Sequence, residues 1–372
     1  MLLVLGVGGR LTWKKVWLYK RLCTNGDNLK IAFFGSDQFS IKSLQYLLEL
    51  QQRKPEIISA IDVITRHPKY AGRHNKQLID VPIATSEIVE NLNIHRADSG
   101  QDILNLLKLN QNRYNLIVAV SYGKLIPAEF IMQCKYGGLN VHPSLLPRYS
   151  GASPLQYSLL NNDEFTGVTL QTLHPTEFDK GDIILQQDCV KIDKNETLKT
   201  LTDKLAEIGG QLLSKAIEEK LFISPKKIIP KYEYSYAPRL KSITKKIKWN
   251  EFNAFDIFRR FNTLGPLYTF IFSHIIKKNK ELKSFKRVIL NDILLIKNED
   301  VNNQFVKVGE FKLNNHDGRL LVNTKNGLIG VGKIKFEGFA EETPVQFINS
   351  LKKRCGNVNL NTFTDNELVS KE

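Results

Sequence analysis

The sequence has few cysteines, and they lie far apart. Only four of the 372 residues are cysteine, and no CxxC pair occurs. The four are Cys23, Cys134, Cys189 and Cys355. Structural zinc sites and disulfide frameworks need clustered or regularly spaced cysteines. We therefore predict neither of them, expect no bound metal, and expect the chain to work in a reducing compartment.

Long hydrophobic runs are also missing. No apolar stretch approaches the roughly 18–20 residues that cross a bilayer as a helix, so we predict no membrane insertion. The hydrophobic fraction of 42% is ordinary for a globular protein. At 372 residues the chain is long enough for two domains that each bury a core.

Acidic residues are absent from residues 1–26. This segment holds five basic residues, and its Leu, Trp and Val side chains alternate with them. The composition is typical of a mitochondrial presequence, whereas a secretory signal has a longer uninterrupted apolar core. We predict a targeting presequence over residues 1–26 and a location in the mitochondrial matrix. An unstructured start with no targeting role is the alternative.

The net charge of +15 is unevenly distributed. Residues 221–290 hold sixteen Lys and Arg against four acids, a net charge of +12. A strongly basic block beside a nearly neutral domain favours a polyanionic partner. The alternative is a solvated lysine-rich surface in a protein from an A/T-rich genome.

Short apolar runs separated by turn signals follow residue 27. The run Leu29–Gly35 predicts a buried strand, and Ser36 and Asp37 precede a helical pattern that they can cap. Further strands are predicted at 57–65, 115–121, 138–141, 167–173 and 183–190, with a closing helix at 197–220. This alternation predicts an α/β domain with a doubly wound sheet over residues 27–221. The first turn is not GxGxxG, so a dinucleotide is not indicated.

The second half of the chain has a different pattern. Residues 222–238 contain three prolines and lose periodicity, so we predict a linker. A helix at 250–264 carries a stripe of phenylalanines that we expect to be core. The short alternating runs that start at Arg287 predict a small β-barrel, and with a last helix at 345–353 they form a domain over residues 239–353. A loose polar tail is expected over residues 354–372.

Two loops are candidates for function. The segment from Arg66 to Lys76 is rich in Lys, Arg and His and has no acid. Loops held on a rigid sheet often carry binding residues, although a solvated loop explains the same composition. The second candidate is the stretch from Gly137 to Pro154, GGLNVHPSLLPRYSGASP.

Within this stretch Asn140 and His142 are two residues apart. In a strand they share one face, while the intervening apolar residues face the core. An amide and an imidazole can together stabilise a carbonyl oxygen that becomes an oxyanion. A carboxylate would orient the imidazole and favour its protonated form. Asp179 in FDKGD is the best candidate, and Asp182 is its rival.

The same residues carry a family resemblance. The stretch NVHPSLLPRYSGASP resembles the signature of folate-dependent formyltransferases, and TGVT from Thr166 followed by FDKG from Phe178 fits that family at the right separation. The SLLPR form, AGR at 71–73 and YAPRL with IKW at 236–249 resemble the methionyl-tRNA formyltransferases within it.

This resemblance runs from about residue 29 to residue 353, and it implies a Rossmann-like N-terminal domain followed by a C-terminal barrel of the oligonucleotide-binding (OB) type. The implied reaction moves the formyl group of 10-formyltetrahydrofolate to the α-amine of methionyl initiator tRNA, for mitochondrial translation initiation. Asn140, His142 and Asp179 match the catalytic trio of the family. The residues that match the segment beside the folate co-substrate are Ser144, Leu145, Leu146 and Pro147. Arg73 matches the arginine that contacts the tRNA acceptor stem, and we expect a monomer.

Two departures from the family pattern bear on the tRNA rather than on the trio. Ser150 stands where many relatives have arginine. His74 and Asn75 lower the density of Lys and Arg in the basic loop. One rival interpretation is a formyl-group enzyme with a small acceptor, such as a nucleotide sugar or glycinamide ribonucleotide, or a hydrolase relative. A second is a non-catalytic RNA-binding protein that keeps the fold.

Overall fold

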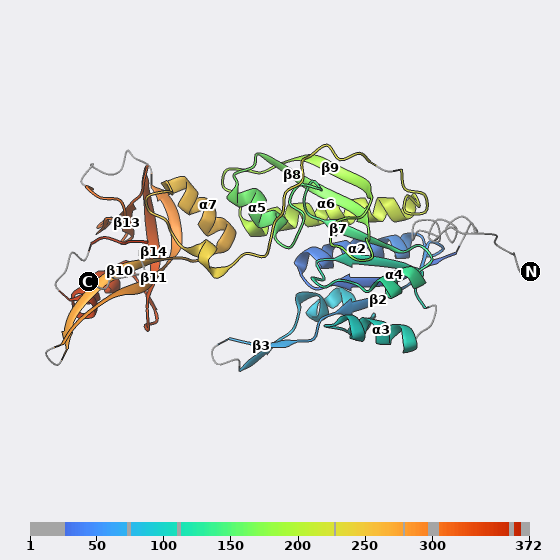
Figure 1. Cartoon of the computed structure of the whole chain (residues 1–372), viewed down its shortest axis with the longest axis horizontal. Coiled ribbons are helices and arrows are strands. Elements are labelled where there is room, and N and C mark those ends of the chain that lie inside the picture. Colours follow the sequence, from blue (N-terminus) through green and yellow to red (C-terminus); the bar gives the residue numbers. More distant parts are fainter. Residues whose placement is uncertain are drawn as a thin grey trace, which may run out of the picture. The chain divides into compact units, whose positions relative to one another are not determined.

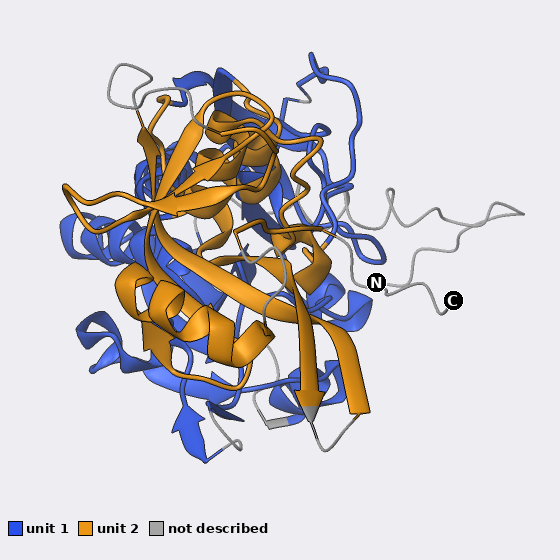
Figure 2. Cartoon of the chain, turned by 90° about the vertical axis from the view of Figure 1, so that its left-hand side faces the viewer, with its two compact units in different colours: residues 1–155, 164–192, 199–238 blue, residues 156–163, 193–198, 239–372 orange. Residues whose placement is uncertain are grey.

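The computed structural model describes residues 27–72, 76–109, 113–226, 228–277, 280–296, 305–356 and 361–365. The expected presequence and Arg73, with His74 and Asn75, lie outside these ranges. The chain divides into two compact units, which are coloured separately in Figure 2. Unit 1 comprises residues 1–155, 164–192 and 199–238, and unit 2 comprises residues 156–163, 193–198 and 239–372.

Unit 1 is built on a seven-stranded sheet in the order β5-β2-β1-β6-β7-β8-β9. The strands are β1 (Leu29–Gly35), β2 (Ile58–Thr65), β5 (Asn93–Arg96), β6 (Leu116–Val120), β7 (Gly138–His142), β8 (Phe165–Thr172) and β9 (Ile183–Lys191). The first five of these strands are mutually parallel, whereas β8 and β9 are antiparallel to their neighbours. The parallel strands read as continuous apolar runs because both faces of the sheet are covered.

Helices cover both faces of this sheet (Figure 1). On one face α2 (Gln38–Arg53) and α6 (Leu198–Glu218) pack together, and Gly209 of α6 lies against Phe39 and Val141. On the other face α3 (Gly100–Leu109) and α4 (Ala128–Gln133) share a buried cluster with Phe34, Ile117 and Phe130. The predicted cap is present, since the Asp37 side chain accepts a hydrogen bond from Ser40 N. The predicted α/β fold of the N-terminal half is confirmed.

The described residues also include short helical segments. Helix α5 spans Pro154–Leu160, and single 3₁₀ turns occur at Pro82–Thr85, Glu87–Val89 and Ser242–Lys245.

The basic loop forms a hairpin that extends from unit 1 (Figure 1). Its strands are β3 (Lys69–Ala71) and β4 (Gln77–Ile79), which pair antiparallel. Arg96 of β5 holds both ends of the segment: its guanidinium donates to Arg66 O at 2.7 Å and to both oxygens of the Asp80 carboxylate, each at 2.7 Å. These hydrogen bonds hold the pKa of Asp80 below its usual range.

Unit 2 is an antiparallel sheet in the order β10-β11-β14-β13-β12, with β15 beside β14. Its elements are α7 (Ala254–Leu264), β10 (Leu267–Lys277), β11 (Lys280–Ile296), β12 (Phe311–Leu313), β13 (Leu320–Asn323), β14 (Leu328–Phe336), β15 (Glu341–Glu342) and α8 (Pro344–Cys355). The predicted C-terminal β domain is confirmed, but its longest strands differ from the expectation. Strand β10 was not predicted, and β11 begins seven residues before Arg287. The run QFVKVGEF joins a strand only at Phe311 because Gly309, with φ +81°, makes a turn before it.

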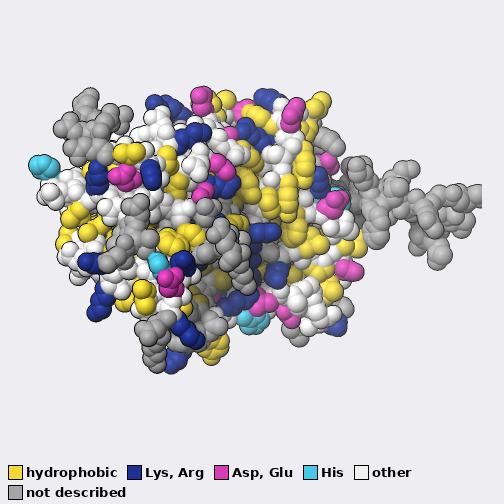
Figure 3. Space-filling view, turned by 60° about the vertical axis from the view of Figure 1, so that its left-hand side comes forward, with side chains coloured by type: hydrophobic (Ala, Val, Ile, Leu, Met, Phe, Trp, Pro, Cys, Tyr) yellow, Lys and Arg dark blue, Asp and Glu magenta, His cyan; other side chains and the backbone are white. Residues whose placement is uncertain are grey.

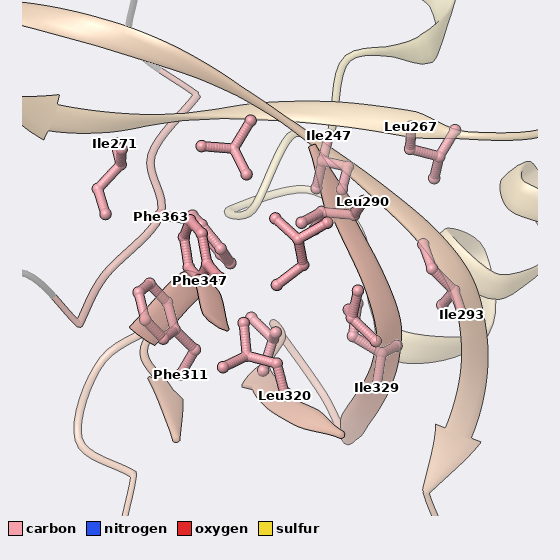
Figure 4. Packing of buried hydrophobic residues seen from close by; sticks show 14 of the residues in the cluster. Ile247, Leu267, Ile271, Leu290, Ile293, Phe311, Leu320, Ile329, Phe347 and Phe363 are labelled. Atoms are coloured by element: carbon pink, nitrogen blue, oxygen red, sulfur yellow. The ribbon is translucent and has the colours of Figure 1, made fainter. Parts of the chain in front are cut away.

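The core of unit 2 contains a group of contacting phenylalanines. Phe311, Phe347 and Phe363 lie together among aliphatic side chains from β10, β11, β13 and β14 (Figure 4). The expected phenylalanine stripe of α7 is only partly buried: Phe252 and Phe261 pack against this core, while the fully buried residue of the helix is Ile257.

The C-terminal segment corrects the expectation of a loose tail after residue 353. Helix α8 continues to Cys355, and Phe363 is only 2% exposed in the core. Thr364 and Phe270 exchange backbone hydrogen bonds, with N···O distances of 2.9 Å and 2.8 Å. Residues 361–365 therefore belong to unit 2, because an apolar side chain and backbone pairing hold an otherwise polar sequence.

The described residues contain neither a membrane-spanning helix nor a cluster of metal ligands. No helix among them is long and apolar enough to cross a membrane. Their His, Cys, Asp and Glu side chains form no group of three or more that could hold a metal ion. On the face drawn in Figure 3, Lys and Arg side chains are spread among hydrophobic ones.

Candidate functional site

Strands β7 and β8 place four polar side chains opposite one another. In their antiparallel register Asn140 pairs with Gln171, and His142 pairs with Thr169. Directly opposite residues of an antiparallel pair project from the same face. Leu139 is fully buried, as expected for the apolar half of the alternation. The predicted common face of Asn140 and His142 is therefore present, and β8 adds two residues to it.

Asp179 joins this face from the turn between β8 and β9. Its Oδ1 lies 3.3 Å from His142 Nδ1, and it accepts from Asn140 Nδ2 at 3.4 Å and from Gln171 Nε2 at 3.3 Å. Its Oδ2 accepts from Gly151 N at 2.7 Å. Three side chains and one backbone amide thus converge on one carboxylate.

The turn that presents Asp179 is tightly constrained. Asp179 has φ +55°, in the left-handed region that few non-glycine residues adopt. A Cβ atom on Gly181 would lie 1.6 Å from Thr172 O, so only glycine fits there. The rival Asp182 is bonded through its backbone to Thr172 at the start of β9. Asp179, rather than Asp182, contacts His142.

Both ring nitrogens of His142 face acceptors. Nδ1 lies 3.3 Å from the Asp179 carboxylate, and Nε2 lies 3.0 Å from Tyr149 O. A ring that carries a proton on each nitrogen donates to both partners. His142 is buried, with its side chain 7% exposed, whereas Asn140 is partly exposed. Of the two polar side chains on β7, Asn140 is therefore the more accessible to a ligand.

The segment Ser144–Pro147 is held by a hydrogen-bond network centred on Thr169. The Thr169 hydroxyl donates to Ser144 O at 2.6 Å and accepts from Leu146 N at 3.1 Å. Gln186 Nε2 donates to the same hydroxyl at 2.8 Å and to Leu146 O at 3.1 Å. The Leu146–Pro147 peptide bond is cis. The first three side chains of the segment are buried and Pro147 is half-buried, so the segment forms a wall of defined shape.

Part of the expected linker belongs to the site. Ser150 N donates to Ser235 O at 2.9 Å, and Ala237 N donates to Ser150 O at 2.7 Å. The Ser235 hydroxyl also accepts from Tyr149 N at 2.9 Å. A Cβ on Gly151 would lie 2.7 Å from Ala237 O, so glycine is required where this segment crosses the loop. Residues 235–237 therefore brace the loop whose Gly151 amide binds Asp179.

The structure brings together most of the predicted site and adds residues to it. Asn140, His142 and Asp179 are in contact, and Ser144–Pro147 follows directly after His142. Thr169, Gln171 and Ser235 were not predicted. In the strand sequence FTGVTLQT, Thr169 and Gln171 alternate with Val168 and Leu170, and this alternation was a signal for a second polar face. No local pattern indicated Ser235.

Comparison with known families and proteins gives the following matches. The sequence profile of the family described as "Formyl transferase" matches residues 29–217, and that of "Formyl transferase, C-terminal domain" matches residues 239–352. A protein of Saccharomyces cerevisiae named "Methionyl-tRNA formyltransferase, mitochondrial" is 35% identical over 367 residues, covering 88% of this chain and 90% of its own length. A protein of Caldicellulosiruptor saccharolyticus named "Methionyl-tRNA formyltransferase" is 31% identical over 334 residues, covering 89% of this chain and 99% of its own.

Solved structures share the fold at low sequence identity. HypX from Aquifex aeolicus in complex with tetrahydrofolic acid aligns with a TM-score of 0.52 and 14% identity, over 88% of this chain and 48% of that one. A multiple variant of the same protein aligns with a TM-score of 0.54 and 15% identity. At this level of identity the likeness concerns the fold alone.

Proposed function

The chain belongs to the formyl transferase family, and from this premise we propose that it is a methionyl-tRNA formyltransferase. It transfers the formyl group of 10-formyltetrahydrofolate to the α-amino group of methionyl initiator tRNA. The observation that carries the proposal is the contact of Asn140, His142 and Asp179 within the matched family region. The two relatives named above, each matched over nearly its full length, support the choice of acceptor.

The reaction begins when the neutral α-amine attacks the formyl carbon. A C–N bond forms, the carbonyl π electrons move to oxygen, and a tetrahedral oxyanion results. Asn140 is partly exposed, and its Nδ2 donates a long hydrogen bond to Asp179 until the oxyanion forms, when this amide donates to the oxyanion instead. One donor of this kind typically lowers the barrier by about 2.7–4 kcal/mol.

His142 and Asp179 support Asn140 in this reaction, His142 through its charge and Asp179 through positioning and proton transfer. Each ring nitrogen of His142 lies beside an acceptor, so the imidazolium form donates to both partners and places a positive charge beside the oxyanion. Asp179 holds this ring in position. As the intermediate collapses, the bond between the formyl carbon and folate N10 breaks, and N10 takes up the proton that the amine loses. Asp179 helps to carry this proton, with water as a carrier if the distance requires it.

The folate co-substrate lies along Ser144, Leu145, Leu146 and Pro147. The buried side chains and the Thr169 network keep this wall rigid, so its backbone and Pro147 are what it offers to a flat ligand. No step of the chemistry requires a metal.

The tRNA binds through basic surfaces. Arg73, which follows β3 in the sequence and lies outside the described residues, contacts the acceptor stem, where a guanidinium can bind phosphate and stack on a base. The basic block of residues 221–290 contacts phosphates. Ser150, only 5% exposed and paired with residues 235–237, removes one charge found in many relatives. The protein acts as a monomer in the mitochondrial matrix, where formylated methionyl-tRNA initiates translation.

One assay tests this function: the transfer of labelled formyl from 10-formyltetrahydrofolate to charged initiator tRNA. Uncharged tRNA and small amines, including amino sugars and glycinamide ribonucleotide, serve as alternative acceptors. We expect transfer to the charged tRNA alone. Faster transfer to a small amine would support a different formyl-group enzyme.

Two variants test the assigned roles in the same assay. Asn140→Ala and His142→Ala should each lower kcat by about 10²–10³ while the Kd for charged tRNA stays unchanged. If both variants kept normal turnover, the trio would have no catalytic role, and a binding protein that keeps the fold would become the better interpretation.

A further inference from the structure

Gln171 is a buried amide that contacts the catalytic carboxylate. The residue is 1% exposed, and its side chain projects from β8 directly opposite Asn140. Its Nε2 donates to Asp179 Oδ1 at 3.3 Å. The Asp179 contact also sets the orientation of the amide, because the reversed amide would place two acceptor oxygens together.

Asp179 Oδ1 is surrounded by more donors than it can bind strongly. Asn140, His142 and Gln171 lie at 3.4, 3.3 and 3.3 Å, and one carboxylate oxygen offers about two lone-pair positions. One of these donors can therefore break its hydrogen bond while Asp179 Oδ1 keeps the others. Asn140 is the most accessible of the three, so it is the donor that can turn to the substrate.

The other end of the same amide has no partner. Gln171 Oε1 is buried and makes no hydrogen bond with the described residues. Burying an unpaired acceptor destabilises the folded state, and an apolar side chain of similar size would avoid that penalty. An amide kept at this position is therefore poorly explained by stability alone.

We propose that Gln171 is a positioning residue for formyl transfer. Its N–H holds the Asp179 carboxylate in place while Asn140 moves its own hydrogen bond toward the developing oxyanion. Gln171 acts through Asp179 and Asn140 and does not itself touch the formyl group. The inference rests on the function proposed above, because it assigns Asn140 to the oxyanion.

Gln171→Met tests the proposal, because methionine is unbranched and of similar length but cannot donate. We expect kcat for charged tRNA to fall at least 10-fold, with unchanged KM for both substrates and an equal or higher Tm. The matched control is Gln187→Met on β9, whose exposed amide bonds only a backbone oxygen at 3.1 Å and which should behave as wild type.

A double variant separates this inference from the proposed function. If Gln171 acts by releasing Asn140, Gln171→Met should lower kcat less than twofold in a protein that already carries Asn140→Ala. Wild-type kcat in Gln171→Met, or a loss that multiplies fully with that of Asn140→Ala, would overturn the inference alone. So would a lowered Tm or a failure to fold, since the amide would then be structural. Normal activity in Asn140→Ala by itself would instead contradict the proposed function.

Discussion

At the scale of single residues, Asp179 depends on contacts from separate parts of the chain. β7 supplies Asn140 and His142, β8 supplies Gln171, and the loop after β7 supplies the Gly151 amide. The Asp179 backbone has a positive φ, which is unfavourable for aspartate. The surrounding hydrogen bonds and the obligatory Gly181 keep it in that conformation. The carboxylate is therefore oriented before any substrate arrives.

Asp179→Asn should preserve the shape of the side chain and remove its charge. The NH₂ group of the new asparagine would then face N–H groups that donate to a carboxylate oxygen in the wild-type protein. We expect kcat to fall by about 10²-fold or more, within the range of lost acid–base catalysis, with little change in Tm. Steady-state kinetics and thermal unfolding measure the two effects.

Asp182→Asn is the matched control for this prediction. Its carboxylate is three residues away in the same turn, so both variants remove one negative charge from that turn. A loss in Asp182→Asn equal to that in Asp179→Asn would assign the effect to charge in the turn and not to contact with His142.

At the scale of elements, the hairpin β3–β4 is held at its base rather than by a hydrophobic face. Tyr70 and Leu78 pair across its strands and are 66% and 54% exposed. A two-stranded hairpin alone is marginally stable in water. The three hydrogen bonds from Arg96 to Arg66 and Asp80 therefore fix where it begins and ends.

Arg96→Met should lower the catalytic efficiency with charged tRNA without affecting the folate site. Charge-assisted hydrogen bonds of this kind contribute about 1.5–3 kcal/mol. We expect kcat/KM for charged tRNA to fall about 10-fold, while KM for 10-formyltetrahydrofolate remains unchanged. Arg53→Met, which removes an exposed arginine of α2 that lies 3.9 Å from Glu218, is the control.

The pH dependence of this effect follows from Asp80. Because its pKa is lowered in the folded protein, the ion pair with Arg96 stabilises the hairpin above the unfolded value of about 3.9 and is lost as pH falls through the lowered pKa. Between pH 6 and 8 the contribution is constant. The ratio of wild-type to Arg96→Met activity should therefore not vary in that range, and a ratio that varied several-fold would contradict the role of this ion pair.

At the scale of the whole molecule, the catalytic residues and most of the basic charge belong to different units. The trio lies in unit 1, whereas most of the basic block belongs to unit 2. Residues 280–287 of β11 alone include four basic residues and one acid. Basic side chains that meet a phosphate backbone release counterions, so the affinity falls with salt.

The salt dependence of tRNA binding tests the role of this charge. For four or more phosphate contacts, log K should fall with log salt with a slope of about −3 or steeper, which weakens binding about 60-fold between 50 and 200 mM. The KM for the folate should change far less. A slope near zero would leave the basic block as a solvated surface without a nucleic-acid partner.

The sequence by itself determined the local features of this protein. Alternation around Asn140 and His142 predicted their common face, apolar runs predicted the parallel strands, and Asp37 predicted the first helix cap. Each of these depends on neighbours within a few residues, where strand and helix periodicity act.

The tertiary structure decided which distant segments meet. The antiparallel register of β7 and β8 places Gln171 opposite Asn140, the turn before β9 selects Asp179 over Asp182, and residues 235–237 brace the loop at Gly151. Phe363 likewise enters a core that its polar flanks do not indicate. Such contacts follow from strand register and packing across long separations, which the pattern of a single segment does not encode.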